Sequence, residues 1–246
     1  MTRWVVRWPL SLLYPLLHHQ NVALRTAFLD RAVRADVASA GEAAAPLVVT
    51  LGAGFDVRQQ RLGEAGVRGH WAELDLPEVV EQKRRLLRRA QRRRPTMPLP
   101  TAQLGANLSD TAAARAAIRA ALRGGPADGA ARPAPAHATF VCEALLIYVP
   151  PAAAAALLAA CIDEAEAAGC ASATICFADR LPGVDGCAEA DARQALAAAG
   201  GWELDRELAA QAGARAAHGR GEVEEVVVRR FCLCGAIYVY TDAHTR

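Results

Sequence analysis

Lysine is nearly absent from this 246-residue sequence: Lys83 is the only one, and arginine supplies the other strongly basic side chains. Because alanine is also very abundant, we attribute this imbalance to coding bias and give it no functional weight. The 28 basic and 26 acidic residues leave a formal net charge of +2. Such a balanced charge gives no overall indication of a nucleic-acid-binding or a disordered protein.

Spacings typical of metal ligands are missing as well. The seven cysteines include no C-x-x-C pair, and the six histidines show no zinc-ligand spacing. Cys142, Cys176 and Cys232 lie in apolar runs, so we expect reduced, buried thiols and no metal site. Free thiols are typical of a reducing compartment, and we predict a cytoplasmic protein.

The sequence also lacks a hydrophobic run of the kind that spans a membrane. Its apolar opening, residues 4–17, is interrupted by Arg7, Pro9 and Pro15. It is shorter than the roughly 20 residues that a spanning helix needs. No small-residue cleavage site follows it cleanly, so we expect a helical cap over residues 1–45 rather than a signal peptide.

The most informative stretch that is present runs from residue 47 to residue 56. An apolar segment of strand length is followed by Gly52-Ala53-Gly54 and, two residues later, by Asp56. This pattern indicates a buried parallel strand ending in a sharp turn, where open α/β sheets bind ligands. A dinucleotide site needs a third small residue at the position of Val57. The pattern instead resembles the first motif of S-adenosylmethionine-dependent methyltransferases, and a plain strand-to-helix turn is the alternative.

Polar residues also stand at the ends of other predicted strands. Asp75 closes a strand pattern at 69–77, about twenty residues after the glycine turn, where a carboxylate can accept from ribose hydroxyls. Asn107 follows a strand expected near 98–104, and Glu143 ends a strand at 137–143. A fifth strand is expected at 171–178. Two motifs at the expected separation indicate a nucleoside site more strongly than either one alone.

Helical patterns separate these strands. We expect helices near 10–40, 58–65, 77–94, 111–122, 151–168 and in an alanine-rich stretch ending near 200. In the first helix, five apolar residues are expected to share one face: Leu24, Phe28, Leu29, Ala32 and Val33. Two late apolar runs, 223–228 and 231–241, are expected to finish the sheet.

The helix expected at 77–94 has a strongly basic polar face. Its members are Lys83, Arg84, Arg85, Arg88, Arg89 and Arg92 to Arg94. One interpretation is a surface for RNA or an acidic partner. We favour the other, a solvated helix whose cationic end is stabilised by the helix dipole. We therefore do not expect a nucleic-acid partner.

Together these motifs are similar to those of the leucine carboxyl methyltransferases. The segments that carry the resemblance are 51–56 (LGAGFD), 73–77 (ELDLP) with Lys83 downstream, 105–108 (GANL) and 142–148 (CEALLIY). Two closing segments, 201–203 (GWE) and 230–234 (RFCLC), also resemble the family. The resemblance covers most of residues 22–241.

The resemblance implies a Rossmann-like class I methyltransferase, an α/β fold with a seven-stranded, mostly parallel sheet and an antiparallel last strand. A single domain would occupy residues 1–246, with a cofactor-binding core at 46–180. Residues 181–246 would form the substrate-side segment and closing strands. The implied cofactor is S-adenosyl-L-methionine. The implied partner is the C-terminal leucine of the protein phosphatase 2A catalytic subunit.

The resemblance also implies a set of cofactor-binding residues: Arg25, Gly52, Asp75, Asn107, Leu108 and Glu143. Arg25 would bind the methionine carboxylate, and Glu143 would lie near the same end of the cofactor. Asp75 would hold the ribose. Asn107 and Leu108 would contact adenine.

The acceptor side is less well defined by the resemblance. Tyr148 is the candidate acceptor contact, and no catalytic acid or base is expected because a carboxylate acceptor is already ionised. The family normally has aspartate at the position of Asn107, and the stretches before Arg25 and between 179 and 201 depart from it. Three alternatives therefore stay open: a tRNA methyltransferase of the wybutosine type, a small-molecule O-methyltransferase, and a non-catalytic cofactor-binding relative.

Overall fold

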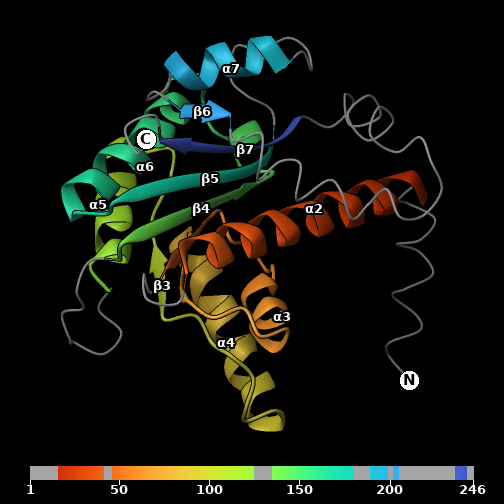
Figure 1. Cartoon of the computed structure of the whole chain (residues 1–246). Coiled ribbons are helices and arrows are strands. Elements are labelled where there is room, and N and C mark those ends of the chain that lie inside the picture. The colour runs from red at the N-terminus through yellow and green to blue at the C-terminus, as the bar shows by residue number, and fades with distance from the viewer. Residues whose placement is uncertain are drawn as a thin grey trace.

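A computed structural model of the chain describes residues 16–41, 46–124, 135–179, 189–198, 202–204 and 236–242. Five parallel strands form the main part of a sheet that has helices on both faces (Figure 1). These strands are β1 Leu47–Leu51, β2 His70–Asp75, β3 Ala102–Gly105, β4 His137–Glu143 and β5 Ser172–Asp179. The predicted α/β class with a parallel sheet is confirmed.

Two further strands lie beyond β5. They are β6 Trp202–Leu204 and β7 Ala236–Asp242, and β7 pairs antiparallel with both β5 and β6. The resulting order is β3-β2-β1-β4-β5-β7-β6. The late run expected at 231–241 thus contributes β7, whereas the run at 223–228 lies outside the described residues. The division of the chain into cap, core and closing segment stays a prediction.

The described helices follow the predicted pattern closely. They are α2 Leu16–Ala40, α3 Arg58–Glu64, α4 Pro77–Arg93, α5 Thr111–Leu122, α6 Pro151–Ala168 and α7 Glu189–Ala198. Proline occupies the first position of α4 and α6, where its missing N–H costs no helical hydrogen bond. The Asp110 carboxylate accepts from the Ala112 and Ala113 N–H groups at the start of α5.

Two apolar cores cover the two faces of the sheet. In one, α5 and α6 pack against the strands through residues such as Ile118, Leu158 and Phe140. In the other, Leu29 of α2 and Leu62 of α3 pack against the opposite face. All five residues of β1 are buried, as expected for a central parallel strand. The carboxyl ends of the parallel strands are thereby held at one edge.

The predicted apolar face of the first helix is partly wrong. Leu29, Ala32 and Val33 are fully buried, but Leu24 is 49% exposed and Phe28 is only partly buried. At 3.6 residues per turn, Leu24 lies roughly 140° around the helix from Leu29. The buried stripe is centred near Leu29 and Val33, so Leu24 falls outside it. Among the described helices, none is long and apolar enough to cross a bilayer.

Candidate cofactor site

The predicted site residues gather at the carboxyl edge of the parallel sheet. Leu51 pairs with Leu74 on one side and with Cys142 on the other, so the glycine turn, Asp75 and Glu143 follow three adjacent strands at the same level. This is the edge at which open α/β sheets bind ligands.

The glycine turn after β1 needs both of its glycines, for different reasons. Gly52 has φ +65°, and a Cβ there would lie 2.9 Å from the Leu145 Cδ1 atom. Gly54 has φ +44°, yet a Cβ there would meet nothing within 4 Å. The backbone at Gly54 therefore faces open space, which allows a ligand to approach it closely.

Asp75 at the end of β2 is tied to this turn. Its Oδ2 accepts from the Gly54 N–H at 2.6 Å, and its Oδ1 accepts from the Leu76 N–H at 2.7 Å. A carboxylate has about four acceptor positions. Each oxygen therefore keeps one position for a further donor, which fits the pair of hydroxyls of a ribose.

A buried ion pair between Lys83 and Glu73 lies next to the glycine turn, and it corrects the prediction made for Lys83. Lys83 was expected on the basic polar face of its helix, but its side chain is buried and lies 2.8 Å from Glu73. Its Nζ also lies 3.4 Å from the Ala53 carbonyl oxygen. Burial raises the pKa of Glu73, although pairing with Lys83 opposes this effect. Lys83 faces inward because Val80 and Leu87, its neighbours on α4, also face the core.

Two arginines bind the carboxylate of Glu143 at the end of β4. Arg25 Nε donates to Oε1 at 2.7 Å, and Arg58 Nη2 donates to Oε2 at 2.6 Å. Thr26 Oγ1 lies 3.3 Å from Oε1. Burial raises the pKa of Glu143, but the two arginines outweigh it, and its pKa lies below the ordinary glutamate value. Glu143 is therefore ionised at neutral pH.

Two further carboxylates complete this cluster. Arg58 binds Asp30 of α2 at 2.9 Å and Asp56 of the glycine turn at 2.7 Å. Arg61 donates to both Asp30 oxygens, at 2.6 and 2.9 Å. These ion pairs link α2, the glycine turn and β4 into one charged network.

The segment after Glu143 is held in a strained conformation. Ala144 has φ +52°, a region that residues with a Cβ rarely adopt. The Asp179 Oδ2 atom accepts from the N–H groups of Leu145 and Leu146, at 2.5 and 2.6 Å. This anchors a 3₁₀ turn, Leu146–Tyr148, whose last side chain is 78% exposed. Tyr148 thus extends from the edge that carries Glu143.

Asn107 and Leu108 follow β3 at the same edge but differ in orientation. Asn107 is exposed, and its Oδ1 accepts from the Ser109 N–H at 3.0 Å. Leu108 is 5% exposed and packs in the core. The expected contact of Leu108 with adenine stays a prediction.

Taken together, the edge presents an arginine next to a glutamate at the end of β4, and a separate carboxylate at the end of β2, on the other side of β1. Arg25 and Glu143 match the carboxylate and ammonium of a free amino acid, and Asp75 matches a pair of hydroxyls. Cys142 beside them is fully buried, and burial raises its pKa well above the ordinary thiol value, so it is no nucleophile. No His, Cys, Asp and Glu cluster suited to a metal occurs among the described residues.

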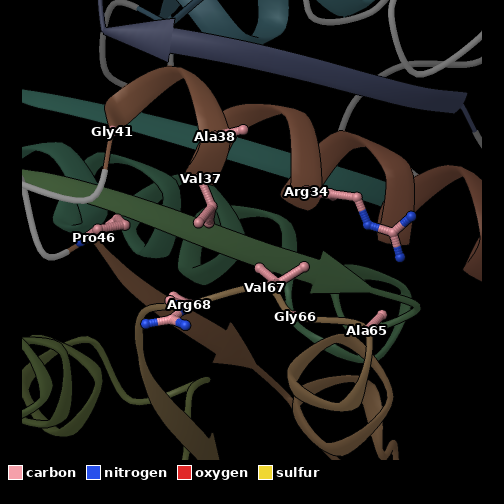
Figure 2. Close-up of a pocket in the computed structure, with 9 residues that line it drawn as sticks. All are labelled: Arg34, Val37, Ala38, Gly41, Pro46, Ala65, Gly66, Val67 and Arg68. Carbon is pink, nitrogen blue, oxygen red and sulfur yellow. The ribbon is translucent and has the colours of Figure 1, made fainter.

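A pocket of about 360 Å³ lies elsewhere, at the amino edge of the sheet. Pro46 before β1, Val67 before β2 and Val37 of α2 line it. Arg34 of α2 and Arg68 before β2 also line it, and their guanidinium groups lie well apart (Figure 2). None of the predicted site residues lines this pocket, and it is separate from the candidate cofactor site.

The sequence interpretation did not identify Arg58 or Asp179 as site residues. Arg58 stands two positions after Asp56, and Asp179 ends β5 as Glu143 ends β4. The position of Asp179 at a strand end was the available signal for it. No comparable signal pointed to Arg58, because two of its three partners, Asp30 and Glu143, lie 28 and 85 residues away.

Comparisons with solved structures give only distant similarities. A structure of LepI in complex with SAM is 20% identical over 68% of this chain and 37% of that chain, with a TM-score of 0.32. An O-methyltransferase, NcsB1, from neocarzinostatin biosynthesis in complex with S-adenosyl-L-homocysteine is 17% identical, with a TM-score of 0.34. That match covers 82% of this chain and 50% of the other. The chain thus spans half or less of the length of these proteins.

A comparison with curated proteins found no match. A family model does match the chain. Its description is leucine carboxyl methyltransferase, and it covers residues 16–162, from α2 into α6. This range includes all of the sequence-predicted site residues and agrees with S-adenosylmethionine as the expected cofactor. Because the model matches more than half of the sequence, the chain belongs to the leucine carboxyl methyltransferase family.

Proposed function

We propose that the chain is an S-adenosylmethionine-dependent carboxyl O-methyltransferase. The observation that carries this proposal is the proximity of Arg25 and Glu143 at the same sheet edge as Asp75. Arg25 and Glu143 are complementary to the amino-acid end of the cofactor, and Asp75 to its ribose. Family membership supports the same chemistry. The seven-stranded sheet with antiparallel β7 fits a class I methyltransferase fold.

The acceptor that we propose is the C-terminal leucine carboxylate of the protein phosphatase 2A catalytic subunit. Phe55, Leu76, Ile147 and Tyr148 are exposed and flank the glycine turn, Asp75 and Glu143 in sequence. Such apolar side chains suit a leucine side chain and help to exclude water from the reacting groups. The closing segment 230–234, which resembles the same family, lies outside the described residues. The buried thiols of Cys142 and Cys176 suit a reducing compartment, and we place the enzyme in the cytoplasm.

The reaction requires alignment rather than proton transfer. S-adenosylmethionine supplies a methyl group on a positively charged sulfur. A carboxylate oxygen of the acceptor forms the new bond to the methyl carbon while the carbon–sulfur bond breaks, and the sulfur keeps the electron pair. The products are a methyl ester and a neutral thioether. Arg25, Glu143 and Asp75 contribute by fixing the position of the methyl group relative to the acceptor.

Transfer of a labelled methyl group tests this proposal. The full chain is incubated with labelled S-adenosylmethionine and the phosphatase catalytic subunit, either intact or lacking its C-terminal leucine. We expect a base-labile methyl ester on the intact subunit only. Equal labelling of both forms would contradict the leucine acceptor. Cofactor binding without transfer would favour a non-catalytic relative or another acceptor.

A second candidate acceptor is tRNA, because α4 carries exposed arginines. Arg88, Arg89, Arg92 and Arg93 are exposed, and the described residues offer them no ion-pair partner. Such a row of cations suits a phosphate backbone. If tRNA were the acceptor, it would bind with an affinity that falls steeply with salt and would receive the labelled methyl group.

A further inference from the structure

Arg58 joins three carboxylates that come from three different parts of the fold. Its side chain is 2% exposed, and its guanidinium binds Asp30 of α2, Asp56 of the glycine turn and Glu143 of β4. A buried guanidinium with three carboxylate partners is fixed in position by its own fork geometry. Arg58 is therefore the least mobile of the three cluster arginines.

Arg25 and Arg58 share Glu143 but are not equivalent. The Arg25 side chain is 21% exposed, and within the described residues it forms an ion pair with Glu143 Oε1. If Arg25 turns to a ligand carboxylate, Glu143 loses the charged donor on Oε1, and the Thr26 hydroxyl stays 3.3 Å from that oxygen. Arg58 stays on Oε2 at 2.6 Å. The Oε1 atom of Glu143 can then accept from a ligand ammonium as well, while its Oε2 atom is still bound to a cation.

We propose that Arg58 is a positioning residue for the amino-acid end of S-adenosylmethionine, acting through Glu143. It holds the Glu143 carboxylate in place when Arg25 leaves it to bind the ligand carboxylate. This inference rests on the proposed function. It assigns Arg58 no contact with the ligand and no part in the methyl transfer itself.

Arg61 provides a matched control for this role. It binds the same Asp30 and lies 3.8 Å from Asp56, but no contact joins it to Glu143 in the described structure. Loss of Arg61 therefore weakens the link between α2 and α3 without removing a donor from Glu143. A merely structural role for Arg58 predicts that Arg58→Gln and Arg61→Gln behave alike.

The test compares two probes by calorimetric titration of the full chain. S-adenosylhomocysteine carries the amino-acid end, and methylthioadenosine lacks it. We expect Arg58→Gln to weaken binding of S-adenosylhomocysteine by at least about tenfold, the effect of a lost hydrogen bond to a charged group. Binding of methylthioadenosine should stay within about twofold. Arg61→Gln should leave both affinities within about threefold of the wild type.

A double-mutant cycle separates action through Glu143 from other effects. In a Glu143→Gln background, Arg58→Gln should weaken S-adenosylhomocysteine binding little further. Arg58→Lys is the substitute variant if Arg58→Gln fails to fold. It keeps the charge but cannot reach all three carboxylates, so we expect its affinity to be intermediate. Between pH 7.5 and 5.5, the affinity of the Arg58→Gln variant for S-adenosylhomocysteine should decrease as the pH is lowered. The affinity of the wild type should stay constant over this range. The reason is that burial raises the pKa of Glu143 and that, in the variant, Arg25 alone opposes this effect. Glu143 is therefore more easily protonated in the variant.

The outcomes distinguish this inference from the proposed function. The inference is overturned if Arg58→Gln weakens both probes equally, if Arg61→Gln reproduces its effect, or if the effect persists in the Glu143→Gln background. The proposed function fails, and the inference with it, if the wild-type chain binds neither probe.

Discussion

The Nε atom of Arg25 lies 2.7 Å from the Oε1 atom of Glu143, so each residue neutralises the other across 118 positions of sequence. The amino-acid end of S-adenosylmethionine carries one carboxylate and one ammonium group. The carboxylate can pair with Arg25, and the ammonium can pair with Glu143. A bound cofactor would replace one ion pair by two, one at each residue. The affinity of the site should therefore depend on both charges.

Replacing Arg25 by glutamine tests the first of these charges. We expect the free energy of S-adenosylmethionine binding to become less favourable by about 1.5–3 kcal/mol, because a charge-assisted hydrogen bond is lost. Calorimetric titration measures this change. Arg34→Gln is the matched control, since Arg34 is exposed on the same helix and lines the pocket at the other edge. An equal effect of both variants would argue against a specific role for Arg25.

Replacing Asp75 by alanine tests the expected ribose contact. The variant loses a carboxylate that also accepts from the Gly54 and Leu76 N–H groups. We expect cofactor binding to weaken by about 1.5–3 kcal/mol. Titration with adenosine, which contains the ribose, should show a similar loss. An unchanged dissociation constant would remove Asp75 from the site.

Alanine at the two turn glycines should separate folding from binding. Gly52→Ala combines a positive φ with an overlap at Leu145 and should destabilise the fold by about 2–4 kcal/mol. Gly54→Ala meets open space and should cost only about 1–2 kcal/mol of backbone strain. We nevertheless expect Gly54→Ala to lose most cofactor affinity. Denaturant unfolding and cofactor titration of the same samples measure both effects, and normal binding by Gly54→Ala would contradict a close approach there.

Removal of Lys83 should make stability depend on pH. Lys83→Met leaves Glu73 buried without its cation and should cost about 3–5 kcal/mol at neutral pH. Burial raises the pKa of Glu73, so the folded form binds a proton more readily than the unfolded form. The Glu73 contribution to the stability of the variant should therefore be greatest below the ordinary glutamate pKa, about 4.3, and fall as the pH rises above it. Glu73→Gln in the same chain should remove this dependence, and persistence of the dependence would assign it to another group.

The exposed arginines of α4 distinguish the two candidate acceptors. Arg88→Ala with Arg89→Ala should leave methylation of the phosphatase subunit unchanged, because both side chains are exposed on α4. The labelled-methyl assay at two salt concentrations measures this. A large loss would show instead that the basic helix engages the acceptor.

The sequence predicts those parts of the site that depend on local sequence patterns. The buried run at 47–51 with its glycines, and the polar ends of β2 and β4, mark one sheet edge because parallel strands align their carboxyl ends. The pairing of Arg58 with Asp30 and Glu143 is not local. It depends on how α2 and α3 dock, which helical periodicity does not specify.

Lys83 and Leu24 illustrate the same limit within single helices. Lys83 belongs to a run of basic residues and was assigned to the polar face, but Glu73 on β2 supplies a buried partner for it. Leu24 was assigned to the apolar face, but the buried stripe is centred on Leu29 and Val33. Residue type predicts burial well only where the tertiary partner is also apolar.

Titration of the full chain with S-adenosylmethionine tests the central claim most directly. The account predicts saturable binding at one site per chain, weakened by Asp75→Ala and by Arg25→Gln and unaffected by Arg34→Gln. Absence of binding by the wild-type chain, or binding that ignores both Asp75 and Arg25, would contradict the assignment of this sheet edge as the cofactor site.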